Sequence, residues 1–126
     1  MDIQELLNQA TKQWRIDRAN SQMTLGELIA ALSVMPEHKQ VQGLCKPHSY
    51  RGYYTDLAFE EAQATSTAGL MLEMVKECLD QTFIGWKGGD FVMTKITPLW
   101  IAERGASGLK IVGLDPNGDF LTREDD

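Results

Sequence analysis

Apolar residues recur at helical spacing in three stretches of this chain, and short runs rich in β-branched and aromatic residues lie between and after them. The first stretch covers residues 2–18 and the third covers residues 68–79. The second begins at Thr24 and ends before Pro36, because the residue preceding a proline avoids helical geometry. Thr24 and Glu27 match a capping box, in which each side chain accepts a hydrogen bond from the other residue's amide. This pattern favours folds in which helices cover a sheet.

The β-rich runs are short, and the glycines in their connections favour hairpins. Residues 41–44 and 57–59 are predicted to pair across an intervening loop. Residues 98–103 and 109–114 are joined by a link of hairpin length, and residues 91–94 read as a further strand. The sequence therefore predicts an α+β fold of three helices packed on a small, mainly antiparallel sheet.

A single domain is expected over residues 1–120, since 126 residues fit one core and no linker divides them. Residues 121–126 are predicted to form a frayed acidic tail. Cys78 lies on the apolar face of the third helix and is expected to be buried. The predicted core consists of Leu6, Trp14, Leu28, Leu32, Leu70, Met74, Leu99 and Ile111. The remaining apolar surface predicts a homo-oligomer, with the first helix as a candidate interface.

Charge and composition exclude several classes of protein. The formal net charge of −6 argues against general nucleic-acid binding, which needs a basic face. No apolar run approaches the length of a membrane span, and the acidic N-terminus does not resemble a signal peptide. The two cysteines are far apart in sequence, which favours free thiols in a reducing compartment. We therefore expect a cytoplasmic protein with no membrane association.

Residues 45–60 concentrate ionisable and aromatic side chains in what reads as a loop followed by a strand. Pro47 lacks a backbone donor and Gly52 permits a positive φ, so both favour a loop. Loops of this kind, fixed to a strand, often carry binding chemistry. In the plainer interpretation the tyrosines cover the edge of the core, Arg51 pairs with a carboxylate, and His48 bonds to the backbone.

Residues 83–90 form a second unusual segment, in which three glycines surround Trp86 and Lys87. The spacing is not that of a phosphate loop, although glycine amides beside Lys87 could still hold an anion. The alternative is a tight turn in which Trp86 fills the core. Together the two segments predict a binding site for a small, anionic, ring-containing ligand. Its expected residues are His48, Tyr50, Arg51, Tyr53, Tyr54, Trp86, Lys87, Gly88 and Arg104, with Phe83 and Trp100 as further stacking faces.

Motifs for catalysis and metal binding are weak by comparison. His48 and Asp56 lie close in sequence, but catalytic triads are assembled in space from separate elements. Cys45 and His48 have finger-like spacing without the second ligand pair that a zinc site needs. The sequence therefore predicts a binding protein with no metal and no cofactor. A small hydrolase or lyase using His48 and Asp56 remains an alternative.

The string at residues 47–60, PHSYRGYYTDLAFE, resembles one carried by small phage and prophage proteins, mostly of unassigned function. The likeness continues through residues 24–29, 85–89 and 100–105, and it covers most of the chain from Thr24 to Gly113. In size and α+β character the chain is also similar to the phage anti-defence proteins that act as nucleotide sponges. That second resemblance implies sequestration of a cyclic oligonucleotide or ADP-ribose-type immune signal without cleavage, in the host cytoplasm. An inhibitor that binds a host protein is the other alternative.

Overall fold

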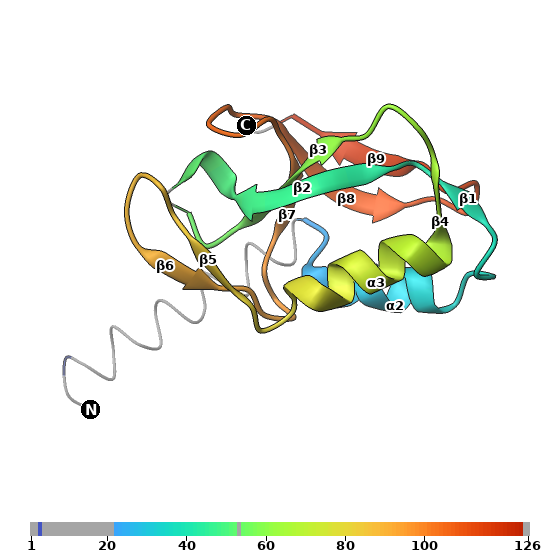
Figure 1. Ribbon diagram of the computed structural model, residues 1–126, viewed down its shortest axis with the longest axis horizontal. Helices are drawn as coiled ribbons and strands as arrows, with labels where there is room; N and C mark the ends of the chain where they lie inside the picture. Colours follow the sequence, from blue (N-terminus) through green and yellow to red (C-terminus); the bar gives the residue numbers. More distant parts are fainter. Residues whose placement is uncertain (1–2, 4–21, 53, 125–126) are drawn as a thin grey trace.

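The computed structural model describes residues 3, 22–52 and 54–124. A five-stranded sheet has the strand order β2-β3-β7-β8-β9, and two helices pack against one of its faces (Figure 1). The helices are α2 (Leu25–Ser33) and α3 (Ala68–Cys78). The strands are β2 (Leu44–Ser49), β3 (Leu57–Glu61), β7 (Leu99–Ile101), β8 (Leu109–Leu114) and β9 (Phe120–Arg123). Apart from Ile3, the first predicted helix lies outside the described residues, as do Leu6 and Trp14 of the predicted core.

Two small sheets complete the described fold. The strands β1 (Gln40–Val41) and β4 (Ser66–Thr67) pair beside the helices, and β5 (Thr82–Ile84) pairs with β6 (Asp90–Val92). Every strand pair is antiparallel except β3 with β7, which is parallel. The predicted α+β class, the mainly antiparallel sheet and the β7–β8 hairpin are confirmed. The predicted pairing of residues 41–44 with 57–59 was wrong, because Leu57 and Ala58 pair with Ser49 and His48, while Val41 pairs with Ser66.

The start of α2 follows from its sequence. The Thr24 hydroxyl accepts a hydrogen bond from the Glu27 amide at 3.2 Å, and the Thr24 amide donates to the Glu27 carboxylate at 3.2 Å. This capping box confirms the prediction. Just before it, the backbone of Met23 bridges two neighbouring strands, because its amide donates to Ile111 and its carbonyl accepts from Leu99. The beginning of α2 is thereby fixed to the sheet.

Four of the predicted core residues are buried: Leu28, Leu32, Leu99 and Ile111. Met74 is half-buried against the same core, but the prediction for Leu70 was wrong, since 61% of its surface is exposed. The buried residues of α3 follow a stripe through Met71 and Val75. Leu70 precedes Met71 by one residue, so it lies roughly 100° around the helix from that stripe.

Two boundaries differ from the sequence prediction. β2 continues to Ser49, so Cys45 to Ser49 are strand and not loop. Pro47 is tolerated because β2 lies at the edge of the sheet and its register with β3 shifts between Cys45 and His48. At the other end, residues 121–123 belong to β9, which pairs with β8, so the chain stays in the sheet up to Arg123.

Cys78 is buried at the end of α3, as predicted, and burial raises the pKa of its thiol from the ordinary 9.0 to about 11, with a smaller contribution from the Glu77 carboxylate. The free energy that Cys78 contributes to folding is therefore complete below pH 9 and is lost as the pH rises towards 11. We expect iodoacetamide at pH 8 to alkylate Cys45, which is partly exposed, well before Cys78. Mass spectrometry of the native protein measures this. Equal rates for the two thiols would contradict the burial of Cys78.

Candidate functional site

Trp86 is the point at which three hairpin loops meet. It follows β5, while Gly52 lies in the turn after β2 and Gly105 lies in the link between β7 and β8. A Cβ atom added at Gly52 would lie 2.5 Å from Cε2 of the indole, and one added at Gly105 would lie 3.1 Å from its Cη2. Both glycines have positive φ, at 82° and 86°. The indole therefore lies against the bare backbone of two other loops, which only glycine permits.

The loop that carries Trp86 is fixed by its backbone hydrogen bonds. The Lys87 amide donates to the Gly52 carbonyl at 2.9 Å, which joins this loop to the turn after β2. The Gly88 amide donates to Gly85 and the Gly85 amide donates to Gly89. These three amides are satisfied by protein carbonyls, so they do not form the anion-binding nest that the glycines suggested.

Two cations lie close to the same indole. Lys87 Nζ is 5.2 Å from the ring centroid of Trp86, and Arg104 Cζ is 5.7 Å from it. Both distances are typical of cation–π contacts. The Trp86 side chain remains 39% exposed, so an aromatic surface and positive charge are accessible together on a protein of net charge −6. We call Trp86, Gly52, Gly105, Lys87 and Arg104 the Trp86 platform.

The other predicted stacking rings lie inside the protein. Tyr50 stacks on Trp100 with ring centroids 4.0 Å apart and planes 7° apart, and only 4% and 2% of these residues are exposed. The Tyr50 hydroxyl accepts from the Gly108 amide, and Trp100 Nε1 donates to Asp56 at 2.7 Å. Neither ring has an accessible face, so the plainer interpretation of the tyrosines describes Tyr50 better than ligand stacking does.

Tyr54 and Phe83 are also poor candidates for stacking. Tyr54 is half-buried beside Tyr50, with ring centroids 5.8 Å apart. Phe83 points inward from β5 and packs against the main core. Tyr53 lies outside the described residues. Of the predicted aromatic residues that the structure describes, Trp86 is the one that offers an accessible face beside cations.

His48 and Asp56 are both interior. The His48 Nδ1 atom lies 2.7 Å from the Lys46 carbonyl, so Nδ1–H donates to it, and the buried Nε2 contacts no hydrogen-bond partner among the described residues. Asp56 is 2% exposed and accepts from Trp100. A general acid or base must reach its substrate within hydrogen-bonding distance. These positions therefore give no support to a hydrolase built on His48 and Asp56, and they remove His48 from the candidate ligand site.

A pocket of about 450 Å³ opens between β3 and the β7–β8 link and shares no residue with the Trp86 platform. Three carboxylates, those of Glu60, Glu61 and Glu103, line it. An anionic ligand would be repelled there. Across the described ranges, no group of three His, Cys, Asp or Glu side chains could hold a metal ion.

Comparisons of the chain with family models, curated proteins and solved structures find no match. In the part of the chain that the structure describes, no helix is long and apolar enough to span a bilayer.

Arg51 adjoins the platform in a conformation that non-glycine residues rarely adopt, with φ at 56°. Lys46, which is not part of the platform, has a similar φ of 50°. At both positions we expect the glycine variant to be more stable than the alanine variant by about 1 kcal/mol, since glycine relieves the strain and alanine does not. Chemical denaturation of the four variants measures this difference. If the difference appears at Lys46 alone, Arg51 is not strained.

Proposed function

We propose that this protein binds a small, anionic, ring-containing ligand of the nucleotide class on the Trp86 platform and holds it unchanged. The observation that carries the proposal is the accessible indole of Trp86, which is held on two glycine backbones with Lys87 and Arg104 beside it. Stacking of a base on an aromatic side chain contributes roughly 1–3 kcal/mol. Lysine and arginine supply charge-assisted hydrogen bonds to phosphate oxygens.

The arrangement favours a ligand with one flat ring and at least two anionic groups. Lys87 and Arg104 come from different loops and both lie over one ring, so the phosphates of a base bound at Trp86 would have two cations close by. Cyclic oligonucleotides and ADP-ribose-type signals both carry at least one base and at least two phosphate groups. Arg51 precedes Gly52 in the chain and is our candidate for a third cation at the ligand.

The residues of the platform support binding of the ligand without a chemical reaction. Lysine and arginine stay protonated at neutral pH unless they are strongly perturbed, and neither acts as a base in that state. His48 and Asp56 lie in the interior. Together with the resemblance to phage proteins, this supports a phage-encoded protein that sequesters an immune nucleotide in the host cytoplasm.

Retention and recovery of candidate nucleotides test this function directly. The protein is incubated with cyclic dinucleotides, cyclic trinucleotides and ADP-ribose isomers, separated from free nucleotide, and denatured by heat. We expect one class to be retained and then recovered intact by chromatography. Recovery of a cleaved product would show an enzyme instead, and failure to retain any class would contradict nucleotide binding.

A second candidate function, inhibition of a host protein, is favoured by the outer face of the β5–β6 hairpin. Ile84 is 77% exposed and Val92 is 53% exposed on this hairpin, where an antiparallel sheet ordinarily presents polar residues to solvent. The same apolar residues support the proposal that the protein forms a homo-oligomer. Light scattering at micromolar concentration distinguishes the two uses. If the protein is a monomer, Ile84 and Val92 are not covered by a second copy of the chain. If Ile84→Lys also leaves nucleotide binding unchanged, a protein partner is the favoured occupant of this face.

A further inference from the structure

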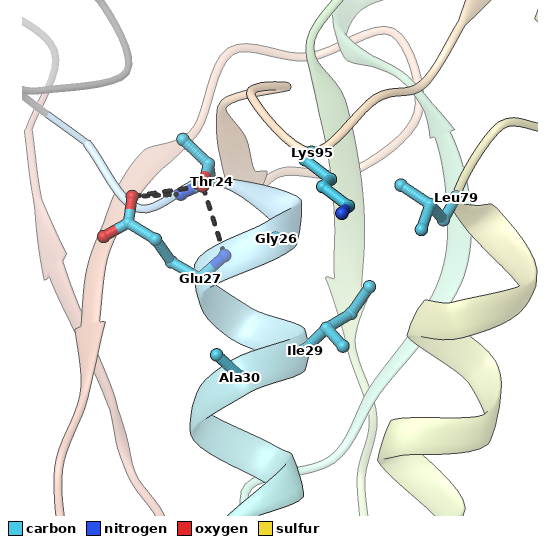
Figure 2. Close-up of a pocket in the computed structure, with 7 residues that line it drawn as sticks. All are labelled: Thr24, Gly26, Glu27, Ile29, Ala30, Leu79 and Lys95. Carbon is cyan, nitrogen blue, oxygen red and sulfur yellow. Dashed lines mark hydrogen bonds between the residues drawn. The ribbon is translucent and has the colours of Figure 1, made fainter.

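A second pocket, of about 450 Å³, lies where the beginning of α2 approaches the end of α3 (Figure 2). Ile29 and Ala30 of α2 and Leu79 after α3 supply apolar walls, and Lys95 lies at its edge. The volume is within the range of small-molecule sites, which are mostly apolar with a few polar groups that fix orientation. The pocket shares no residue with the Trp86 platform.

Gly26 determines where Lys95 lies. A Cβ atom at Gly26 would be 2.9 Å from the Lys95 carbonyl oxygen and 3.0 Å from the Lys95 Cβ. The Gly26 amide donates to that carbonyl at 2.9 Å. Glycine in the first turn of a helix costs about 1 kcal/mol relative to alanine. At Gly26 the absence of a side chain allows the close approach that holds Lys95 against α2.

Among the residues that line this pocket, Lys95 supplies the positive charge. Glu27 also borders the pocket, but its carboxylate accepts from both the amide and the hydroxyl of Thr24. In Figure 2 Glu27 reaches back to Thr24 on one side of α2, while the Lys95 amine lies on the other side, towards Ile29 and Leu79. The positive end of the α2 dipole lies close by and adds to the potential of the lysine.

We propose that this pocket binds a small amphipathic anion, with an apolar chain between Ile29 and Leu79 and a carboxylate or similar head group on Lys95. The anion pairs with the ammonium group and not with the helix N-terminus, because the first amides of α2 are satisfied. Leu25, Gly26 and Glu27 donate to Thr97, Lys95 and Thr24, respectively. The site is independent of nucleotide binding and requires no chemical step.

The test uses octanoate as the probe, with octanol and octylamine as neutral and cationic counterparts, and follows the methyl signals of the full chain by NMR. We expect saturable octanoate binding that shifts Ile29 and Leu79, and weaker or no binding of the two counterparts. Lys95→Gln is expected to weaken octanoate binding about three- to tenfold, while Lys46→Gln, which changes an exposed lysine outside the pocket, leaves it unchanged.

A second variant keeps the proposal testable if Lys95→Gln fails to fold. Ile29→Glu places a carboxylate on the side of α2 where Figure 2 shows the Lys95 amine, and it is expected to abolish the octanoate-induced shift of Leu79 while the remaining spectrum stays folded. Three results would each overturn the proposal. They are no saturable binding of octanoate, equal binding of octanol with no effect of Lys95→Gln, and shifts confined to Ile84 and Val92 of the β5–β6 hairpin.

Discussion

Replacing Trp100 with alanine is expected to lower the free energy of unfolding by about 3–5 kcal/mol, the usual cost of deleting a buried tryptophan. Trp100 is 2% exposed, and its ring lies 4.0 Å from that of Tyr50. The substitution opens a cavity beneath Tyr50 and removes the hydrogen bond from Nε1 to the buried Asp56. Urea denaturation with a linear extrapolation measures the change.

Two other tryptophan variants separate the causes. Trp100→Phe keeps an aromatic ring but leaves Asp56 without this donor, so a loss of about 1–3 kcal/mol is expected. Trp86→Ala is expected to cost no more than about 1–2 kcal/mol, because the 39% exposed indole covers loops and leaves no cavity in the main core. If Trp86→Ala destabilises the protein as much as Trp100→Ala does, Trp86 is a core residue and the platform is misassigned.

Gly52→Ala is expected to lower the free energy of unfolding by about 2–4 kcal/mol and to displace the indole. Two effects combine: a positive φ of 82°, and a Cβ atom only 2.5 Å from the Trp86 ring. Gly88→Ala is the control for a glycine without a steric clash, since Gly88 also has positive φ, at 147°, but has no other atom within 4 Å of an added Cβ. It should show the backbone effect alone, about 1–2 kcal/mol.

A double-mutant cycle isolates the clash with the indole. In a Trp86→Ala background the added methyl group at position 52 meets no ring, so Gly52→Ala should lose roughly 1–2 kcal/mol less stability than in the native protein. Denaturation of the four proteins in the cycle gives the coupling energy. Strict additivity would mean that Trp86 does not lie against Gly52 in solution.

Features that depend on neighbouring residues could be predicted from the sequence. The capping box at Thr24, the extent of α3 and the β7–β8 hairpin each follow from spacing within a few residues. The position of a strand in its sheet and the buried face of a helix were harder to predict. Pro47 indicated a loop because the sequence does not reveal that β2 is an edge strand, where proline is tolerated. Leu70 has the composition of a core residue but lies beside the buried stripe.

Several residues of the candidate site could be predicted from the sequence, but the contacts between them could not. Trp86, Lys87 and Arg104 were singled out as aromatic or basic residues near glycines, and the structure brings these three together. The roles of Gly52 and Gly105 were missed, because an isolated glycine in a loop gives no sign of the ring that rests on it. Tyr50 could not be distinguished from an exposed ring, since its partner Trp100 is 50 residues away in the sequence. Contacts between distant loops decide both cases.

Calorimetry on variants of Trp86 and of the adjoining Arg51 tests nucleotide binding at the Trp86 platform most directly. A thermal-shift screen of cyclic dinucleotides, cyclic trinucleotides and ADP-ribose isomers first selects a nucleotide that stabilises the native protein. We expect Trp86→Ala to weaken its binding by about 1–3 kcal/mol and Arg51→Ala by about 1.5–3 kcal/mol, while Lys46→Ala, outside the platform, leaves the affinity unchanged. A selected nucleotide whose affinity ignores both Trp86→Ala and Arg51→Ala, or a screen in which none stabilises the protein, would contradict a nucleotide site on the Trp86 platform.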